Sequence, residues 1–313
     1  MSGQDAKAVY QRFVEEVINE GNVEVIPELF SSDYVDRTRP PGAPEGLAGV
    51  KMIPQMFRGA FPDVHFTIED MVSEGDTVAT SVTGRGTHQG PFLGIEPTGR
   101  QAAWASMGFF RVEDGKIAEH WGVPDLLTLM MQLGVIPAPP ADPNAPGAVD
   151  TSTPEEKEQR AQLEAIEPDP EEGKRIMRHH VEDLFNKHDL SELDEWLAPG
   201  YCYHVLGQDI YGAEGYRSTV YPLWDAFPDT HNEIQQQVAE GELVSTLWKA
   251  TGTHEAEFFG VPPTGKRIEI YGISIECIRG SKRLEGWGCP DMLGLMQQIG
   301  AVPSPEQSAG ART

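Results

Sequence analysis

The sequence predicts an α+β protein with two tandem cone-shaped domains, each a curved antiparallel sheet packed against N-terminal helices. Three observations carry this prediction: the two halves of the chain repeat each other, each half opens with helical patterns, and each half continues with alternating, strand-like patterns. The 313 residues also suit about two domains of ordinary size. A curved sheet packed against helices can form a cone with an apolar mouth, which is a natural pocket for a small molecule.

The repeat has a constant offset of 166 residues, as from Phe61 to Phe227 (227 − 61). Such a register indicates duplication of one domain, and two units of this size form a tandem pair rather than a solenoid. The matched blocks, first copy and then second, are FPDVHF (61–66) with FPDTHN (227–232), GTHQGPFLGIEPTGR (86–100) with GTHEAEFFGVPPTGK (252–266), and WGVPDLLTLMMQLGVIP (121–137) with WGCPDMLGLMQQIGAVP (287–303).

The repeat also sets the expected domain boundaries. The segment between the copies opens with a Pro/Ala-rich stretch that is typical of an extended linker. Within it, Thr153 followed by Pro154 and two glutamates is a helix-start pattern, so we expect a short helix through about Ile166. The expected organisation is domain 1 at 1–138, a linker at 139–169, domain 2 at 170–304 and a flexible tail at 305–313.

The elements of the first copy can be predicted in order. Residues 5–20 place apolar side chains at helical spacing, Val23–Phe30 predicts a short second helix, and residues 46–60 predict a third. From residue 64 onward apolar and polar residues alternate, and the segments EGD and EDG are hairpin turn signals. These signals predict long antiparallel strands and a last helix that begins at Asp125; the strands are expected at 64–73, 77–88, 100–112 and 116–123.

Composition and charge exclude several functions. A formal net charge of −25 argues against nucleic acid and against anionic membrane surfaces, and no run of about 18 apolar residues predicts a membrane span. Three cysteines suggest neither a disulfide framework nor a zinc site, and the N-terminus lacks the pattern of a secretory signal, so we expect a cytoplasmic protein. The sequence has no dinucleotide, phosphate-loop or Ser-His-Asp motif, and we expect no cofactor and no metal.

The motifs of both copies resemble a known family. FPD-x-H-F, GTH-x-G-x-F-x-G-x-x-PTG and EHWGVPD, in that order, resemble the SnoaL-like polyketide cyclases of the NTF2-like superfamily. This resemblance implies NTF2-like domains and an intramolecular aldol reaction without metal or cofactor. It also implies an acid/base residue at the end of the last strand, which falls on Asp125 and Asp291, and a histidine after the first short strand, which falls on His204. The first copy departs from the pattern, because Arg37 stands in place of that histidine.

Asp125, Asp291 and His204 are therefore the catalytic candidates. Each aspartate also follows a proline and precedes an apolar helical run, so its alternative role is a helix-start residue that satisfies free backbone amides. A carboxylate held by amide donors has a lowered pKa and is a poor base, whereas burial against an aromatic group such as Trp121 or Trp287 raises the pKa. His204 is expected to transfer a proton to Asp291 or to hydrogen-bond it.

The candidates for substrate binding are aromatic and polar side chains near the expected pockets, and each has a structural alternative. Asp36 and Arg37 can reach a pocket mouth or form a surface ion pair. Trp121 shares one face of the last strand with Glu119, as Trp287 does with Glu285, and that face is either the pocket or an outer surface for a domain–domain contact. The substrate-binding candidates are Asp36, Arg37, Trp104, Trp121, Tyr203, Tyr271 and Trp287.

The leading expectation is a cofactor-independent acid/base enzyme that cyclises or isomerises an apolar, polyketide- or terpenoid-like small molecule. One alternative, from a similarity to limonene-type epoxide hydrolases, is epoxide opening by Asp36, Arg37 and Asp125. Another is a non-catalytic protein that binds a small hydrophobic molecule, in which the aspartates are helix caps. Duplication also predicts an internal pseudo-dimer with two unequal pockets, and further homo-oligomerisation is left open.

Overall fold

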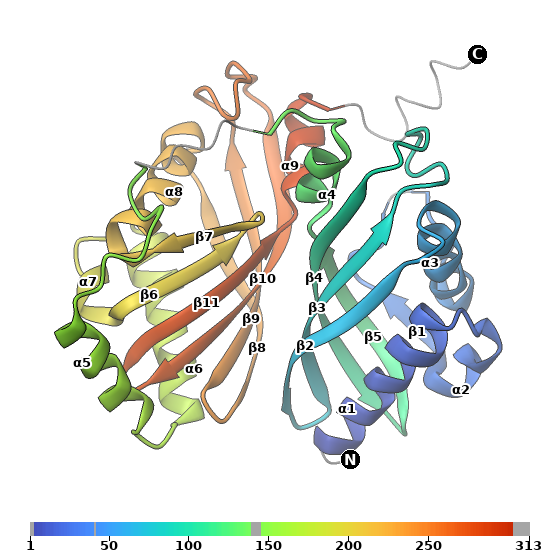
Figure 1. Ribbon diagram of the computed structural model, residues 1–313, viewed down its shortest axis with the longest axis horizontal. Coiled ribbons are helices and arrows are strands. Elements are labelled where there is room, and N and C mark those ends of the chain that lie inside the picture. Colours follow the sequence, from blue (N-terminus) through green and yellow to red (C-terminus); the bar gives the residue numbers. More distant parts are fainter. Residues whose placement is uncertain (1–2, 41, 139–144, 303–313) are drawn as a thin grey trace. The chain divides into compact units, whose positions relative to one another are not determined.

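A computed structural model describes residues 3–40, 42–138 and 145–302. They form two compact units: unit 1 ends at Ala138, and the residues from 145 to 302 belong to unit 2. In each unit helices come first in the chain and pack against a twisted sheet (Figure 1), which confirms the predicted α+β class and its two tandem domains. The predicted tail at 305–313 and residues 139–144 of the predicted linker lie outside the described residues, and the predicted pseudo-dimer stays a prediction.

Unit 1 has the order of elements that the hydrophobic pattern predicts. Its first helix continues from α-helical into π-helical geometry at Phe13, and the second predicted helix is split into a short 3₁₀ turn and one α-helical turn. In chain order the elements are α1 (Gly3–Arg12), η1 (Phe13–Asn19), η2 (Val23–Val25), α2 (Ile26–Leu29), β1 (Phe30–Asp36), α3 (Gly46–Ala60), β2 (His65–Glu74), β3 (Thr77–Thr87), β4 (Gln101–Glu113), β5 (Lys116–Pro124) and α4 (Leu126–Leu133).

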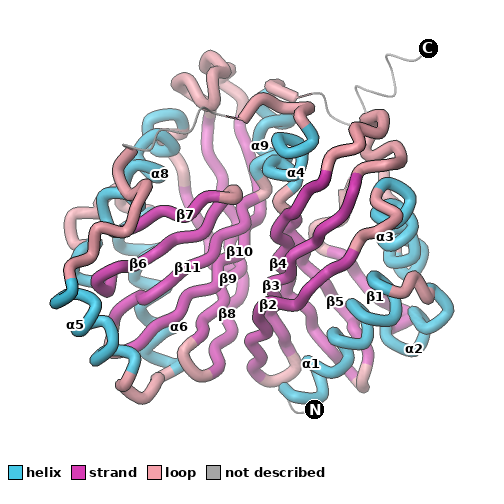
Figure 2. Tube along the Cα trace, viewed as in Figure 1, coloured by secondary structure: helices cyan, strands magenta, loops and turns pink. Residues whose placement is uncertain are grey.

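Unit 2 repeats this order without an equivalent of η2 and adds two elements. A helix, α5, precedes the repeat, and an additional edge strand, β7, follows β6. The elements are α5 (Pro154–Glu164), α6 (Pro170–His179), η3 (His180–Phe185), α7 (Leu193–Trp196), β6 (Leu197–Val205), β7 (Gln208–Tyr211), α8 (Gly212–Ala226), β8 (His231–Glu240), β9 (Leu243–Thr253), β10 (Arg267–Arg279), β11 (Lys282–Pro290) and α9 (Met292–Ile299). Figure 2 distinguishes helices, strands and loops by colour. The predicted linker helix is α5, with Thr153 as its N-cap in a capping box with Glu156.

Both sheets depart from the purely antiparallel arrangement that was predicted. The strand order is β1-β5-β4-β3-β2 in unit 1 and β7-β6-β11-β10-β9-β8 in unit 2. The first strand of each repeat, β1 or β6, pairs in parallel with the last, β5 or β11. This is sterically allowed because a helix and a three-strand excursion separate the paired strands in the chain, which is the long connection that parallel pairing needs.

A β-bulge in the last hairpin of each unit changes which residues share a face. In unit 2, Cys277 pairs with Glu285 but Ile278 pairs with Arg283, so Leu284 is the extra residue. Because the alternation of side chains is reversed at a bulge, Arg283 and Glu285 lie on opposite faces although they are two residues apart. The same irregularity recurs in unit 1 between Arg111 and Val112.

The core of unit 1 is filled by aromatic rings. Phe110 packs against Tyr10 with ring centroids 4.6 Å apart, and Trp104 stacks on Phe57 at 5.6 Å. Trp104 and Phe110 are almost completely buried. Rings of this size bury large apolar areas, so they supply much of the driving force for folding this unit.

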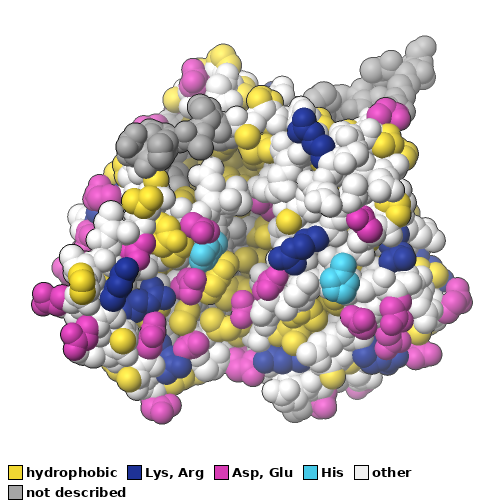
Figure 3. Space-filling model, viewed as in Figure 1, with side chains coloured by type: hydrophobic (Ala, Val, Ile, Leu, Met, Phe, Trp, Pro, Cys, Tyr) yellow, Lys and Arg dark blue, Asp and Glu magenta, His cyan; other side chains and the backbone are white. Residues whose placement is uncertain are grey.

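The surface carries many acidic side chains, in keeping with the formal net charge of −25. Acidic side chains are spread over the face drawn in Figure 3 rather than gathered in one patch. Within the described ranges, no helix is both long and apolar enough to cross a membrane.

The end of α4 provides a test of the backbone geometry. Gly134 ends this helix in the left-handed conformation, with φ of 76°. We predict that Gly134→Ala lowers the free energy of unfolding by about 1–2 kcal/mol, because a Cβ is disfavoured there. Gly59→Ala, inside α3 and with open space around its Cβ, is the control and should be neutral or stabilising by up to about 1 kcal/mol. Urea unfolding measures both, and equal effects contradict the prediction.

Candidate functional site

Unit 2 contains an internal cavity of about 390 Å³, enough to hold a small organic molecule. Helices η3, α8 and α9 form one part of its wall, and strands β6, β9, β10 and β11 form another, with smaller contributions from α6, β7, β8 and the connecting loops. Most of the lining is apolar and includes Phe185, Val220, Phe227, Ile268, Ile270 and Leu295. A cavity of this kind favours a largely apolar ligand and leaves orientation to a few polar groups.

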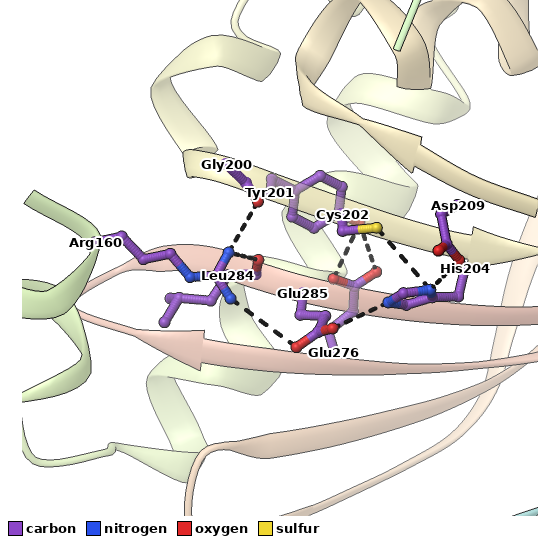
Figure 4. A network of polar contacts seen from close by, with 9 residues as sticks. All are labelled: Arg160, Gly200, Tyr201, Cys202, His204, Asp209, Glu276, Leu284 and Glu285. Carbon is purple, nitrogen blue, oxygen red and sulfur yellow. Dashed lines mark hydrogen bonds and ion pairs between the residues drawn. The ribbon is translucent and has the colours of Figure 1, made fainter. Parts of the chain in front are cut away.

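The polar groups of the cavity include a buried ion pair between Glu276 of β10 and Arg283 of β11, each about 1% exposed. Arg283 Nε lies 3.0 Å from Glu276 Oε2, and Arg283 Nη2 lies 2.6 Å from Oε1. Tyr201 joins this pair, since its hydroxyl accepts from Arg283 Nη2 at 2.8 Å. The same hydroxyl donates to the Glu276 carboxylate at 3.3 Å (Figure 4). Two-point pairing of this kind fixes both groups in one geometry.

The same arginine fixes the direction of a second chain of hydrogen bonds. Arg283 Nη1 lies 3.1 Å from His180 Nδ1, and His180 Nε2 lies 2.8 Å from the hydroxyl of Tyr216. A guanidinium only donates, so Nδ1 of His180 must accept and the imidazole proton must sit on Nε2. Nε2–H then donates to Tyr216, whose own hydroxyl proton is left to donate elsewhere. His180, Tyr216, Glu276 and Arg283 all line the cavity.

The pKa shifts follow from burial and from Arg283. Burial, and then the positive charge of Arg283, lower the pKa of His180 well below 6.5, so the ring stays neutral. Burial raises the pKa of Glu276, and Arg283 opposes that rise. The pKa of Tyr216 is raised by burial, which keeps the phenol protonated and able to donate.

Of the residues predicted in unit 2, Tyr203 lines the cavity. His204 is the next residue of β6 and projects from the opposite side of the sheet, which we call the outer face. There its Nδ1 lies 2.7 Å from Asp209 Oδ1 and its Nε2 lies 3.0 Å from Glu285 Oε1 (Figure 4). The expected partnership of His204 with Asp291 is therefore corrected: alternation along the strand gives this histidine two other carboxylates.

Both predicted catalytic aspartates are helix N-caps. Asp125 Oδ1 accepts from the amide of Thr128 at 3.0 Å, and Asp291 Oδ1 accepts from the amide of Gly294 at 2.8 Å. Burial nevertheless raises the pKa of both carboxyls against these bonds. The residues on either side of Asp291 line the cavity of unit 2, whereas Asp291 is not among the lining residues.

In unit 1 the predicted Asp36 and Arg37 go to different partners. Asp36 Oδ1 lies 3.7 Å from Nδ1 of His120, and Arg37 pairs with Glu119. Burial raises the pKa of Asp36, but the bonds and charge from His120 and Thr38 outweigh it, and the net pKa is lowered. Asp125 caps α4, so each of the three residues expected for epoxide opening has a structural partner of its own.

The remaining aromatic candidates lie in the core of unit 1 or on the outer face of a sheet. Trp104 belongs to the aromatic core of unit 1. The ring of Trp287 stacks on His204 on the outer face, with centroids 5.3 Å apart, and Trp121 is the equivalent, partly buried residue of unit 1. Tyr271 follows the cavity-lining Ile270 in β10, so its side chain leaves from the outer face.

Four members of the polar network of unit 2 are replaced by apolar residues in unit 1, whereas Tyr201 corresponds to Tyr34. Strand pairing aligns Glu276 with Phe110 and Arg283 with Ile117, because these residues occupy the same places in the last hairpin of each sheet. The first residues of the π-helical turns, His180 in η3 and Phe13 in η1, also correspond, and Tyr216 aligns with Val50. The interior of unit 2 thus holds a cavity with a few buried polar groups, whereas aromatic side chains pack the core of unit 1; the expectation of two unequal pockets stays a prediction.

Sequence reasoning missed Glu276, Arg283, His180 and Tyr216. A usable signal was present, since a glutamate and an arginine stand in unit 2 where the repeat has a phenylalanine and an isoleucine. Charged residues at positions that are apolar in the other copy are candidates for a buried site, because an unpaired charge is not tolerated there.

Comparisons with known proteins agree with the repeat. A family model described as SnoaL-like polyketide cyclase matches residues 8–133 and 175–299, together more than half of the chain. No curated protein matches the chain.

Similar solved structures each cover less than half of the chain. IdmH of Streptomyces antibioticus, described as a candidate polyketide cyclase, is 36% identical over 42% of this chain and 99% of its own, with a TM-score of 0.38. A candidate polyketide cyclase of Bacillus cereus is 32% identical over 44% and 87%, with a TM-score of 0.39. TsrD of Streptomyces laurentii is 28% identical over 44% and 99%, with a TM-score of 0.41.

The capping geometry of Asp291 predicts the effect of two substitutions. Asp291→Ala removes the bond to the amide of Gly294 and should cost about 0.5–2 kcal/mol of stability. Asp291→Asn keeps a capping oxygen and should cost clearly less. Urea unfolding followed by circular dichroism compares them, and an equal loss for both variants argues against the cap.

The neutral state of His180 predicts a pH dependence of stability. The unfolded chain takes up a proton near pH 6.5 and the folded chain does not, so this contribution is complete above about pH 6.5 and is lost as the pH falls. The free energy of unfolding should fall by up to about 1.4 kcal/mol per pH unit from this group.

His180→Phe, which places the residue found in unit 1, should remove that part of the slope between pH 6.5 and 5. The exposed His65→Gln is the control and should leave it unchanged. Identical slopes for wild type and His180→Phe would mean that His180 titrates alike in both states.

Proposed function

The chain belongs to the SnoaL-like polyketide cyclase family, and on that premise we propose that unit 2 cyclises or isomerises a small, largely apolar carbonyl compound through an enolate, without a cofactor. The family supports a cyclase- or isomerase-type activity in general. The cavity and its buried polar network support the finer statement. The expectations of a cytoplasmic location and of an internal pseudo-dimer are kept as parts of this proposal.

One observation carries the proposal: the donor-only guanidinium of Arg283 orients His180, which leaves the hydroxyl proton of Tyr216 free for a ligand. A hydroxyl aimed at a carbonyl oxygen stabilises the negative charge that develops when the carbonyl becomes an enolate. Because the chain Arg283–His180–Tyr216 is fixed before the ligand arrives, little reorganisation is needed during the reaction. Tyr203, whose ring centroid lies 5.2 Å from that of Tyr216, is positioned to bind the same part of the ligand.

Glu276 is the group best suited to accept the proton from carbon. It lines the cavity, and burial raises the pKa of its carboxyl, which makes the carboxylate a stronger base than an exposed one. In the proposed step a C–H bond next to the carbonyl breaks, its proton moves to a Glu276 oxygen, and its electron pair forms the enolate. In cyclisation the enolate carbon then attacks a second carbonyl of the same molecule, which closes a ring and gives an alkoxide that takes the proton from Glu276. In isomerisation the proton returns from Glu276 to another carbon.

The N-cap aspartates have a different role in this proposal. Asp291 holds the start of α9, whose Met292 and Leu295 line the cavity, so it supports the wall rather than the reacting atoms. Asp125 does the same for α4 in unit 1. Their catalytic assignment from the family resemblance remains the competing hypothesis, and the experiment below separates the two.

We predict that Glu276→Gln and Tyr216→Phe each lower turnover, by about 10²–10⁴ for the base and about 10²–10³ for the hydroxyl donor. Both changes keep the shape of the residue. Asp291→Asn should keep most of the activity. Extract of the native host is incubated with each protein, and small molecules are compared by chromatography and accurate mass. Cyclisation or isomerisation gives a product of unchanged mass, or one that has lost one water, with wild type and with Asp291→Asn, but little of it with Glu276→Gln or Tyr216→Phe.

The other outcomes support other functions. Loss of activity in Asp291→Asn with full activity in Glu276→Gln moves the base to Asp291. A product that has gained one water indicates epoxide opening. A compound that all variants retain equally and leave unchanged indicates a binding protein.

A further inference from the structure

The outer face of unit 2 carries a cluster of metal-ligating side chains that the proposed reaction does not use. Cys202 and His204 stand two residues apart on β6, and Asp209 on β7 is the direct cross-strand partner of His204. One ligand atom from each, Sγ, Nδ1 and a carboxylate oxygen, lies within 4.8 Å of the others. Cys202 Sγ and His204 Nδ1 are 3.9 Å apart (Figure 4), so small side-chain movements bring all three atoms onto one ion.

We propose that Cys202, His204 and Asp209 bind one divalent cation of the zinc class. A set of one sulfur, one nitrogen and one oxygen ligand suits Zn²⁺, which is commonly held by three protein groups with a fourth position left for water or another ligand. Magnesium and calcium take oxygen ligands only and are disfavoured here. The sequence predicted no zinc site because Cys202 and Asp209 are in different strands and no Cys-x-x-Cys spacing marks them.

The surroundings of His204 fit a metal ligand. Its Nε2 lies 3.0 Å from Glu285 on β11, the carboxylate–histidine contact that usually orients a metal-bound imidazole. When Nε2–H donates to Glu285, the lone pair of Nδ1 points at Asp209, whose oxygen also carries only lone pairs. A contact of 2.7 Å between these two atoms needs either a proton or a metal ion between them, and a divalent cation bound there would replace that proton.

Charge at the cluster also favours a cation. Burial raises the pKa of the Cys202 thiol to about 11, so its thiolate forms only when a metal ion displaces the proton. That thiolate and the carboxylate of Asp209 would then balance a divalent ion, and Glu285 has its own partner in Arg160 of α5 at 3.9 Å. Unit 1 provides an internal comparison, because the same places hold Val35 and Arg37. There a permanent guanidinium pairs with the carboxylate that corresponds to Glu285, which leaves neither a ligand set nor room for a metal ion.

The test uses Co²⁺ as a spectroscopic probe for Zn²⁺ in the full chain after removal of metal with a chelator. We expect one Co²⁺ per chain, a thiolate-to-cobalt charge-transfer band, and displacement of Co²⁺ by one equivalent of Zn²⁺. Cys202→Ser should abolish the charge-transfer band. Asp209→Asn should weaken binding more than tenfold, and Glu285→Gln by about 10–100-fold. Circular dichroism confirms that each variant is folded.

Cys277→Ser is the matched control, because Cys277 pairs with Glu285 across the strands but lies outside the cluster. It should keep the band and the affinity. The proposal is overturned if wild type gives no charge-transfer band, if Cys277→Ser removes it, or if Co²⁺ binds equally well to wild type and Cys202→Ser. These readouts do not involve turnover, so they stand or fall separately from the proposed reaction in the cavity.

Discussion

The buried pair of Glu276 and Arg283 is the constraint on which the candidate site depends. Two charges inside a protein cost free energy, and their mutual attraction offsets that cost only when the remaining hydrogen-bonding atoms are satisfied. Here Tyr201 and His180 complete the set. Unit 1 shows that the fold does not need the pair, since phenylalanine and isoleucine occupy its place in the same sheet. Its presence in unit 2 is therefore better explained by the geometry that it imposes on polar groups of the cavity.

Strand alternation and one bulge separate two kinds of chemistry on the sheet of unit 2. On β6, Tyr203 lines the cavity and His204 lies on the outer face. On β11 the bulge at Leu284 places Arg283 inside and Glu285 outside. The inner set polarises a hydroxyl in an apolar cavity, whereas the outer set offers sulfur, nitrogen and oxygen ligands close to solvent.

The fold could be predicted from sequence because it depends on patterns that repeat: the helical spacing, the alternating strands and the matched turns. The helix-cap role of Asp291 could also be predicted, because a proline before it and an apolar helical run after it form a local pattern. Two features of the sheets produce no periodic pattern in the sequence: the parallel pairing of β1 with β5 and the edge strand β7. The site was missed for two reasons. The repeat directs attention to residues that the copies share, whereas His180, Tyr216, Glu276 and Arg283 differ between the copies. A bulge also interrupts the alternation along β11, so counting alternate residues does not place Arg283 in the interior.

The most direct test of this account is the tautomer of His180. A ¹⁵N NMR measurement of the imidazole nitrogens in the full-length protein at neutral pH distinguishes the three forms of the ring. The hydrogen-bond chain from Arg283 predicts a protonated Nε2 and an unprotonated Nδ1. A proton on Nδ1, alone or together with Nε2, would contradict it, because Arg283 could not then donate to this ring and Tyr216 would not be held as a donor toward the ligand.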